Sequence, residues 1–130
     1  MPTIFSKIVE GQIPCYKIYE DDNFLAFLDI NPLAEGHTLL ITKQEIDYFF
    51  DIDDKMLSEM ILVAKKIAKA LKKSIECKKV GMIVIGDEVP HAHIHLIPFQ
   101  NPLQMSFSSP KLKLSNEQFI EIQQKILSNL

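Results

Sequence analysis

The chain has 130 residues and a net charge of −3, from 17 acidic residues against 14 basic ones, all of them lysine. This length suits one domain with a hydrophobic core, and we treat residues 1–130 as a single domain. The negative charge and the absence of arginine argue against nucleic acid as a partner, because phosphate backbones are bound by cationic surfaces and arginine forks.

The sequence also argues against a membrane protein. The longest apolar runs, residues 24–28 and 60–64, are far shorter than the ~20 residues that a spanning helix needs. The N-terminus lacks the basic and then apolar layout of a signal peptide, so we expect a cytoplasmic protein. In that reducing compartment Cys15 and Cys77 are expected to be free thiols without a function.

The first half of the chain predicts a short helix and three strands. Ile4, Phe5 and Ile8 share one helical face, with Thr3 as the cap and Gly11 at the end of the helix. Strands are predicted at residues 17–19 and 24–29, where they form a hairpin, and at residues 37–42.

The second half predicts a long helix, two strands and a final helix. Apolar residues recur at helical spacing from position 57 to position 75, namely Leu57, Met60, Ile61, Ala64, Ile67, Ala68, Leu71 and Ile75. Strands at residues 80–85 and 91–97 follow, separated by a turn at 86–88. An irregular stretch leads to a capping box at Ser115 and Gln118, which opens the last helix. The order of elements indicates an α+β fold with an antiparallel sheet.

Three of the four histidines, His91, His93 and His95, alternate with apolar residues in the predicted strand at 91–97. Side chains of a strand point to opposite faces in turn, so the three imidazoles share one face while Ala92, Ile94 and Leu96 enter a core. This pattern indicates a site built from imidazole rings.

Two kinds of chemistry fit such a row of imidazoles. The outer two rings lie about 13 Å apart on an extended strand, which is too far for one metal ion unless His37 supplies a ligand. Alternatively, a neutral imidazole is a good nucleophile at phosphorus, and neighbouring rings can donate hydrogen bonds to phosphate oxygens or protonate a leaving group. A zinc-dependent hydrolase therefore stays open beside a metal-independent phosphoryl-transfer enzyme.

The segment from His91 to Ile97 resembles the signature of the histidine triad (HIT) superfamily of nucleotide hydrolases and transferases. Residues 4–8, 20–21, 24–30 and 36–41 are similar to the N-terminal half of that family, so the resemblance spans roughly residues 3–99. It implies a HIT-like α+β fold: a five-stranded antiparallel sheet, one long helix, short N- and C-terminal helices, and a C-terminal extension at 99–130.

The resemblance also implies roles for individual residues. His93 would attack the α-phosphorus of a nucleotide and form a nucleotidyl-histidine, with His91, His95 and His37 as the supporting catalytic histidines. Asp29 would bind the ribose hydroxyls. The walls of the nucleotide site would be Phe5, Ile8, Phe27, Ile30, Leu39, Gly86 and Glu88, although core packing is an equal alternative for the apolar ones.

Two departures from the family pattern stand out. Many relatives carry Cys-x-x-Cys near the N-terminus as part of a structural zinc site, whereas Thr3 and Ser6 stand here, so we expect no metal and no cofactor. Glu88 follows Gly86 where relatives carry Gly-Gln-Ser, and a carboxylate there would repel phosphate but could accept a hydrogen bond from an amine.

The resemblance thus implies a homodimeric hydrolase of a nucleoside phosphoramidate or a dinucleoside polyphosphate, with a purine nucleotide as its partner. A catalytically weak nucleotide-binding protein is a further alternative.

Overall fold

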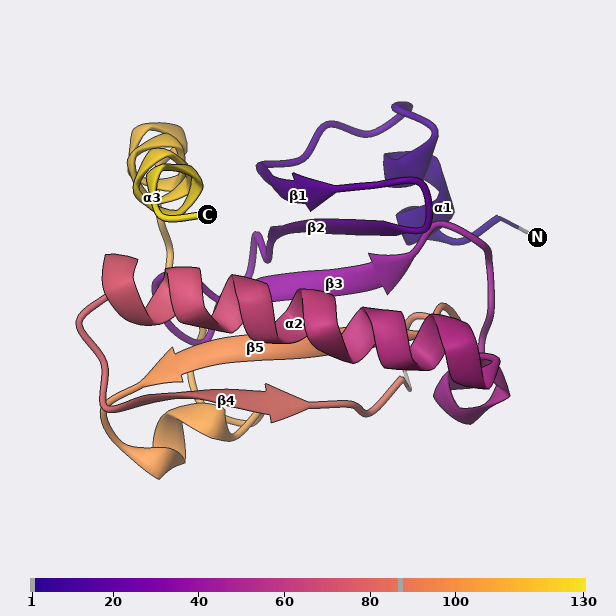
Figure 1. Cartoon of the computed structure of the whole chain (residues 1–130). Helices are drawn as coiled ribbons and strands as arrows, with labels where there is room; N and C mark the ends of the chain where they lie inside the picture. Colours follow the sequence, from indigo (N-terminus) through magenta and orange to yellow (C-terminus); the bar gives the residue numbers. More distant parts are fainter. Residues whose placement is uncertain (1, 87) are drawn as a thin grey trace.

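The computed structural model describes residues 2–86 and 88–130, and Figure 1 shows the order of its elements. Helix α1 (Ile4–Val9) is followed by strands β1 (Lys17–Glu20), β2 (Phe24–Leu28) and β3 (Thr38–Thr42). The short 3₁₀ helix η1 (Phe49–Asp51) leads to the long helix α2 (Asp54–Ser74) and to strands β4 (Lys79–Ile83) and β5 (His93–Phe99). A second 3₁₀ helix, η2 (Pro102–Met105), precedes helix α3 (Asn116–Ser128).

Within the described residues, the five strands pair antiparallel into one sheet in the order β1-β2-β3-β5-β4. This confirms the predicted α+β fold, with one long helix and a helix near each end of the chain. Strands β3 and β5 are central neighbours, and their register places Leu39 opposite His95 and Ile41 opposite His93. The candidate histidines therefore sit in the middle of the sheet.

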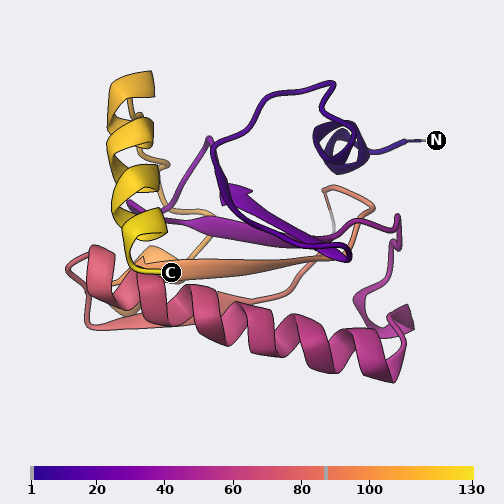
Figure 2. The same cartoon turned by 45° about the horizontal axis from the view of Figure 1, so that its top comes forward.

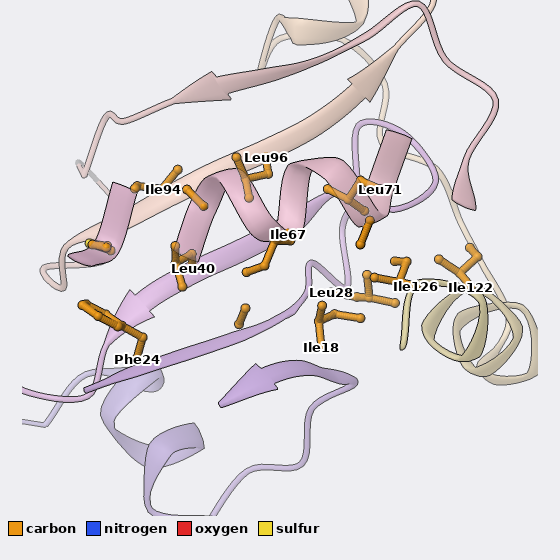
Figure 3. Close-up of a cluster of buried hydrophobic side chains, with 14 of the residues drawn as sticks. Ile18, Phe24, Leu28, Leu40, Ile67, Leu71, Ile94, Leu96, Ile122 and Ile126 are labelled. Atoms are coloured by element: carbon orange, nitrogen blue, oxygen red, sulfur yellow. The ribbon is translucent and has the colours of Figure 1, made fainter. Parts of the chain in front are cut away.

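The two faces of the sheet carry different layers (Figure 2). Helices α2 and α3 cover one face, and their apolar sides pack with the strands into the main core (Figure 3). On the other face, Phe5 of α1 packs with Leu25, Phe27, Leu39 and Ile41. Because side chains alternate along β5, Ile94 and Leu96 enter the main core while His93 and His95 face the α1 side.

The helix boundaries largely follow the capping signals. Thr3 accepts a hydrogen bond from the Ser6 amide at the start of α1, Asp53 caps α2, and the predicted capping box of Ser115 and Gln118 opens α3. The long helix ends at Ser74, one residue before Ile75, which still packs against the main core. Of the predicted apolar stripe, Ile61 is 39% exposed. No helix of the described residues is long and apolar enough to cross a membrane.

Strand β5 begins at His93, two residues later than predicted, and β4 runs over 79–83 instead of 80–85. The cause lies in the backbone hydrogen bonds before β5: the His91 amide donates to the Val89 carbonyl, and the Ala92 amide donates to the Ile46 carbonyl. His91 is therefore not part of the strand. The predicted turn at 86–88 includes Asp87, which lies outside the described residues.

Gly36 allows the chain to enter β3 directly after the loop that follows β2. Its φ is +85°, and a Cβ at this position would lie 2.9 Å from a side-chain carbon of Ile75. Both the left-handed backbone and the close approach require glycine. This turn places His37 directly before β3, beside His95 of β5.

Candidate active site

A cavity of about 420 Å³ lies on the α1 side of the sheet. Its wall includes all the residues expected to bind nucleotide, namely Phe5, Ile8, Phe27, Asp29, Ile30, Leu39, Gly86 and Glu88, together with His93 and His95. His37 and His91 are not on the wall, and both are almost fully buried behind it. The four candidate histidines therefore form two pairs, each with one ring on the cavity and one ring behind.

The first pair is His93 with His91. The Nδ1–H of His93 donates to the backbone carbonyl of His91 at 2.7 Å, and a carbonyl can only accept. Burial lowers the pKa of His93 below its usual value, so the ring is neutral at pH 7 and its Nε2 carries a lone pair without a proton. The ring of Phe5 packs edge-on at 5.1 Å and holds the imidazole in place. His93 thus presents an unprotonated nitrogen.

The second pair is His95 with His37, and here the ring on the cavity has the opposite tautomer to that of His93. The amide of Leu33 donates to Nδ1 of His37 at 3.0 Å, so the proton of the neutral His37 ring is on Nε2. That Nε2–H donates to Nδ1 of His95 at 3.0 Å, which leaves the proton of His95 on its Nε2. Burial lowers the pKa of His37 to about 3 and that of His95 to about 4, so both rings are neutral at pH 7. His95 thus presents a hydrogen-bond donor.

His91 is held from both sides behind the cavity wall. Its Nε2–H donates to the Thr42 carbonyl at 2.7 Å, and its Nδ1 lies 2.9 Å from the hydroxyl of Thr3. The ring is fully buried. His91 lies outside β5 and behind the wall, and its backbone carbonyl holds the Nδ1–H of His93.

Asp29 follows β2 and places a carboxylate on the cavity wall. One oxygen accepts a hydrogen bond from the Asn31 amide at 2.9 Å, and the other lies 3.6 Å from Nε2 of His37. Burial raises the pKa of Asp29, and the Asn31 amide opposes that shift. The carboxylate keeps acceptor capacity for a pair of hydroxyl groups, as on a ribose.

The apolar wall serves two purposes. Phe5, Phe27 and Leu39 are buried in the cluster between α1 and the sheet and also line the cavity. These three residues therefore belong both to the core and to the cavity wall. Ile8 is partly buried, and Ile30 is 65% exposed and contributes only to the wall. An apolar wall of this kind suits a ring system.

Sequence reasoning missed Phe107 and Lys111, which come from the segment between η2 and α3. The ring of Phe107 lies 4.8 Å from that of His95 and 6.4 Å from that of His37. The Lys111 ammonium donates to the Phe107 carbonyl at 2.6 Å, and the side chain lines the cavity. This segment therefore covers the site of its own chain, although no periodic pattern in it signals a contact.

Asp29, His37 and His95 bring three potential ligand atoms within 4.8 Å of one another. They do not fit a metal ion in this arrangement. The Nε2 of His37 carries a proton, because its Nδ1 already accepts from the Leu33 amide, so no lone pair is free on the nitrogen that faces the other two groups. These three residues therefore do not support the zinc-hydrolase alternative.

A family model for the HIT domain matches residues 10–101. The chain belongs to the histidine triad family. An uncharacterized HIT-like protein from Borreliella burgdorferi is 43% identical over 136 residues, covering 98% of this chain and 97% of that protein. The adenosine 5'-monophosphoramidase HNT1 of Saccharomyces cerevisiae is 41% identical over 96 residues, covering 73% of this chain and 61% of that enzyme.

The solved structures agree with this membership. The zinc-bound histidine triad family protein from Mycobacterium smegmatis superposes with a TM-score of 0.82 at 29% identity, covering 97% of this chain and 91% of that one. Membership of the family supports a role in nucleotide hydrolysis or nucleotide binding.

Proposed function

We propose that the chain is a hydrolase of nucleoside phosphoramidates that acts through a covalent nucleotidyl-His93 intermediate. The observation that carries this proposal is the hydrogen bond from the Nδ1–H of His93 to the His91 carbonyl, which leaves Nε2 unprotonated on a cavity wall. The similarity to a yeast adenosine 5'-monophosphoramidase supports the substrate class.

In the first step the lone pair of His93 Nε2 attacks the α-phosphorus. The phosphoramidate reacts with its amine nitrogen protonated, so the bond from phosphorus to that nitrogen breaks and a neutral amine leaves as the bond from Nε2 to phosphorus forms. Water then attacks the phosphorus in a second step, which breaks the bond to Nε2 and releases the nucleoside monophosphate. One proton of the water stays on the phosphate and the other is taken up by the released amine. The neutral His93 is restored, so no further reactant is needed.

His95 assists as a hydrogen-bond donor. Its ring lies 4.8 Å from that of His93, and its Nε2–H would stabilise the negative charge that builds up on the phosphoryl group. A neutral imidazole N–H is a weak acid, so donation of a hydrogen bond and not full proton transfer is the role that this tautomer supports. His37 holds His95 in that tautomer from behind.

The rest of the nucleotide would follow the wall of the cavity. Asp29 would accept hydrogen bonds from the ribose hydroxyls, and the base would enter the apolar slot formed by Phe5, Ile8, Phe27, Ile30 and Leu39. A purine has the larger ring system and would bury more of this slot.

Glu88 and Lys111 set the charge around the leaving group. Glu88 raises the pKa of Asp29 and Lys111 lowers it, so opposite charges act at this end of the cavity. The carboxylate of Glu88 favours an amine leaving group. The ammonium of Lys111 favours an anionic one, which makes a dinucleoside polyphosphate the second candidate substrate.

We also propose a homodimer built on the edge strand β4. Apolar side chains are exposed along this edge and on neighbouring η1, namely Tyr48, Phe50, Met82, Val84 and Ile85. Pairing of β4 with its copy would continue the sheet and cover this patch. Light scattering should give twice the chain mass for the wild type and a monomer for Met82→Lys, while Leu127→Lys on α3 stays dimeric. A monomeric wild type would contradict the dimer.

The hydrolase proposal is tested by mass spectrometry of protein quenched during turnover of adenosine 5'-phosphoramidate. We expect a mass increment of one adenylate group on the peptide that contains His93. Calorimetry showing that AMP binds, with no turnover of phosphoramidates or polyphosphates, would instead indicate a nucleotide-binding protein without activity.

A further inference from the structure

Four side chains from distant parts of the sequence meet behind the nucleophile, where the start of α1 contacts the segment before β5. These are Thr3, Ser6, Glu45 and His91, which we call the N-terminal cluster. The Thr3 hydroxyl lies 2.9 Å from Nδ1 of His91, and the Ser6 hydroxyl donates to the Glu45 carboxylate. The same carboxylate oxygen accepts the Thr3 amide at 3.1 Å.

The hydrogen bonds of the cluster run in one direction. Because the Nε2 of His91 donates to the Thr42 carbonyl, its Nδ1 must accept, and the Thr3 hydroxyl is the donor. The Thr3 oxygen in turn accepts from the Ser6 amide at 3.0 Å. The Thr42 carbonyl therefore sets the tautomer of His91, and the Thr3 hydroxyl holds the other side of its ring.

Two contacts connect the N-terminal cluster to the nucleophile, His93. The carbonyl of His91 holds the Nδ1–H of His93, and Phe5, between Thr3 and Ser6 in sequence, packs edge-on against both rings at 5.9 and 5.1 Å. A shift of α1 relative to His91 would therefore move both supports of the nucleophile at once.

The N-terminal cluster occupies the place where the family pattern implies a structural zinc ion, and the residues present do not fit one. The donors are two neutral hydroxyls, one carboxylate and one imidazole, with no thiolate. Structural zinc sites use cysteine and histidine ligands, and neutral hydroxyls are poor substitutes. The imidazole nitrogen that could bind zinc already accepts the Thr3 hydroxyl.

We propose that the N-terminal cluster is a metal-free device that positions His93, with Thr3 as its central positioning residue. It joins α1 to His91 by hydrogen bonds, at the point where a zinc ion would join them in a relative with cysteines. The catalytic readouts of this proposal rest on the proposed hydrolase function, whereas the spectroscopic and metal readouts do not.

The first experiment removes the Thr3 hydroxyl while keeping the shape of the side chain. Thr3→Val should lower kcat about tenfold, the effect of one lost buried hydrogen bond, with KM changed less than twofold. Thr3→Ser should restore the rate, because it restores the donor. Thr38→Val is the matched control, because it removes another buried hydroxyl, which bonds the Gly36 carbonyl and is not part of the N-terminal cluster. This control should leave kcat within about twofold.

Histidine ¹⁵N spectra of the same variants report the cluster without turnover. In the wild type and in Thr3→Ser, His91 should show a bare Nδ1 and a protonated Nε2. In Thr3→Val the Thr42 carbonyl still holds the Nε2–H of His91, so the tautomer should stay the same, but the Nδ1 signal should shift to that of a bare nitrogen without a hydrogen-bond donor. An unchanged Nδ1 signal of His91 in Thr3→Val, together with an unchanged kcat, would overturn the proposal.

The second experiment converts the cluster into a metal site. The double variant Thr3→Cys with Ser6→Cys adds two thiolates beside Glu45 and His91, and it should bind about one zinc ion per chain with four ligands. The wild type should bind less than about a tenth of an equivalent under the same conditions. Stoichiometric zinc in the wild type that is lost in Thr3→Val would overturn the metal-free assignment.

The two experiments separate failure of this proposal from failure of the hydrolase function. If no substrate is turned over but the Nδ1 signal of His91 depends on Thr3, the cluster stands and the hydrolase proposal falls. If turnover is normal in Thr3→Val, the hydrolase proposal stands and the positioning role of Thr3 falls.

Discussion

The two histidine pairs of the site differ in the backbone groups that hold them. His93 meets a carbonyl, that of His91, whereas His37 meets an amide, that of Leu33. A carbonyl requires a proton on the nitrogen that it contacts, and an amide requires a lone pair there. The result is that His93 and His95, which are neighbours on one face of β5, expose opposite ends of the imidazole to the cavity.

This difference shows how one residue type can provide two functions within a few ångströms. Both rings are buried and neutral, so charge does not distinguish them. The tautomer does: His93 carries a lone pair and His95 carries a proton.

Replacing the nucleophile should have the largest effect. His93→Ala removes the only group assigned to bond with phosphorus, and we expect kcat/KM for adenosine 5'-phosphoramidate to fall by about 10⁴-fold or more. Steady-state assays with a matched preparation of wild type measure this directly. A variant that retained even a tenth of the rate would show that another group attacks phosphorus.

His95→Ala should cost less, by about 10²- to 10³-fold in kcat, which is typical for loss of one donor to a developing oxyanion. Because the neutral His95 donates a hydrogen bond and does not release its proton, the loss should be similar for an amine and for a more acidic aryl-oxide leaving group. A loss that disappears with the acidic leaving group would mean that His95 is a proton donor.

Acid should destabilise the folded chain through the second histidine pair, His37 and His95. The pKa values of His37 and His95 are lowered to about 3 and about 4, so below pH 6.5 the unfolded chain takes up protons that the folded chain does not. Stability from this source is complete above pH 6.5 and is lost as the pH falls toward 4, by up to about 1.4 kcal/mol per pH unit for each ring.

Urea unfolding at pH 7 and pH 5 measures this loss. His37→Asn should show a smaller difference between the two pH values than the wild type, because one of the two rings no longer titrates. An identical pH dependence in both proteins would mean that His37 is not held neutral in the folded chain.

Replacing Lys111 should have the smallest and most selective effect on kcat/KM. Lys111→Gln should lower kcat/KM for diadenosine tetraphosphate by about tenfold, the scale of one charge-assisted hydrogen bond, and change that for the phosphoramidate much less. Lys113→Gln, two residues away and exposed, serves as the control. Equal losses on both substrates would place Lys111 at the α-phosphate instead of the leaving group.

The fold and the row of histidines could be predicted from the sequence because both depend on periodicity. Alternation along residues 91–97 separates the imidazoles from Ala92, Ile94 and Leu96, and these three are buried in the main core. The capping residues Thr3 and Ser115 mark helix starts for the same local reason.

The chemistry within the site could not be predicted in this way. The tautomers depend on the Leu33 amide and the His91 carbonyl, whose directions are set by loops, and hydrogen-bond direction has no sequence period. The start of β5 at His93 depends on a hydrogen bond to Ile46, a residue remote in sequence. Phe107 and Lys111 line the cavity from an irregular segment, where no periodic pattern in the sequence indicates a contact.

The opposite tautomers of His93 and His95 are the central claim, and histidine ¹⁵N spectra of the free protein at pH 7 test it most directly. The account predicts that His93 is protonated at Nδ1 with a bare Nε2, and that His95 is protonated at Nε2 with a bare Nδ1. If both rings show the same tautomer, or if His93 carries its proton on Nε2, the assignment of nucleophile and donor is wrong.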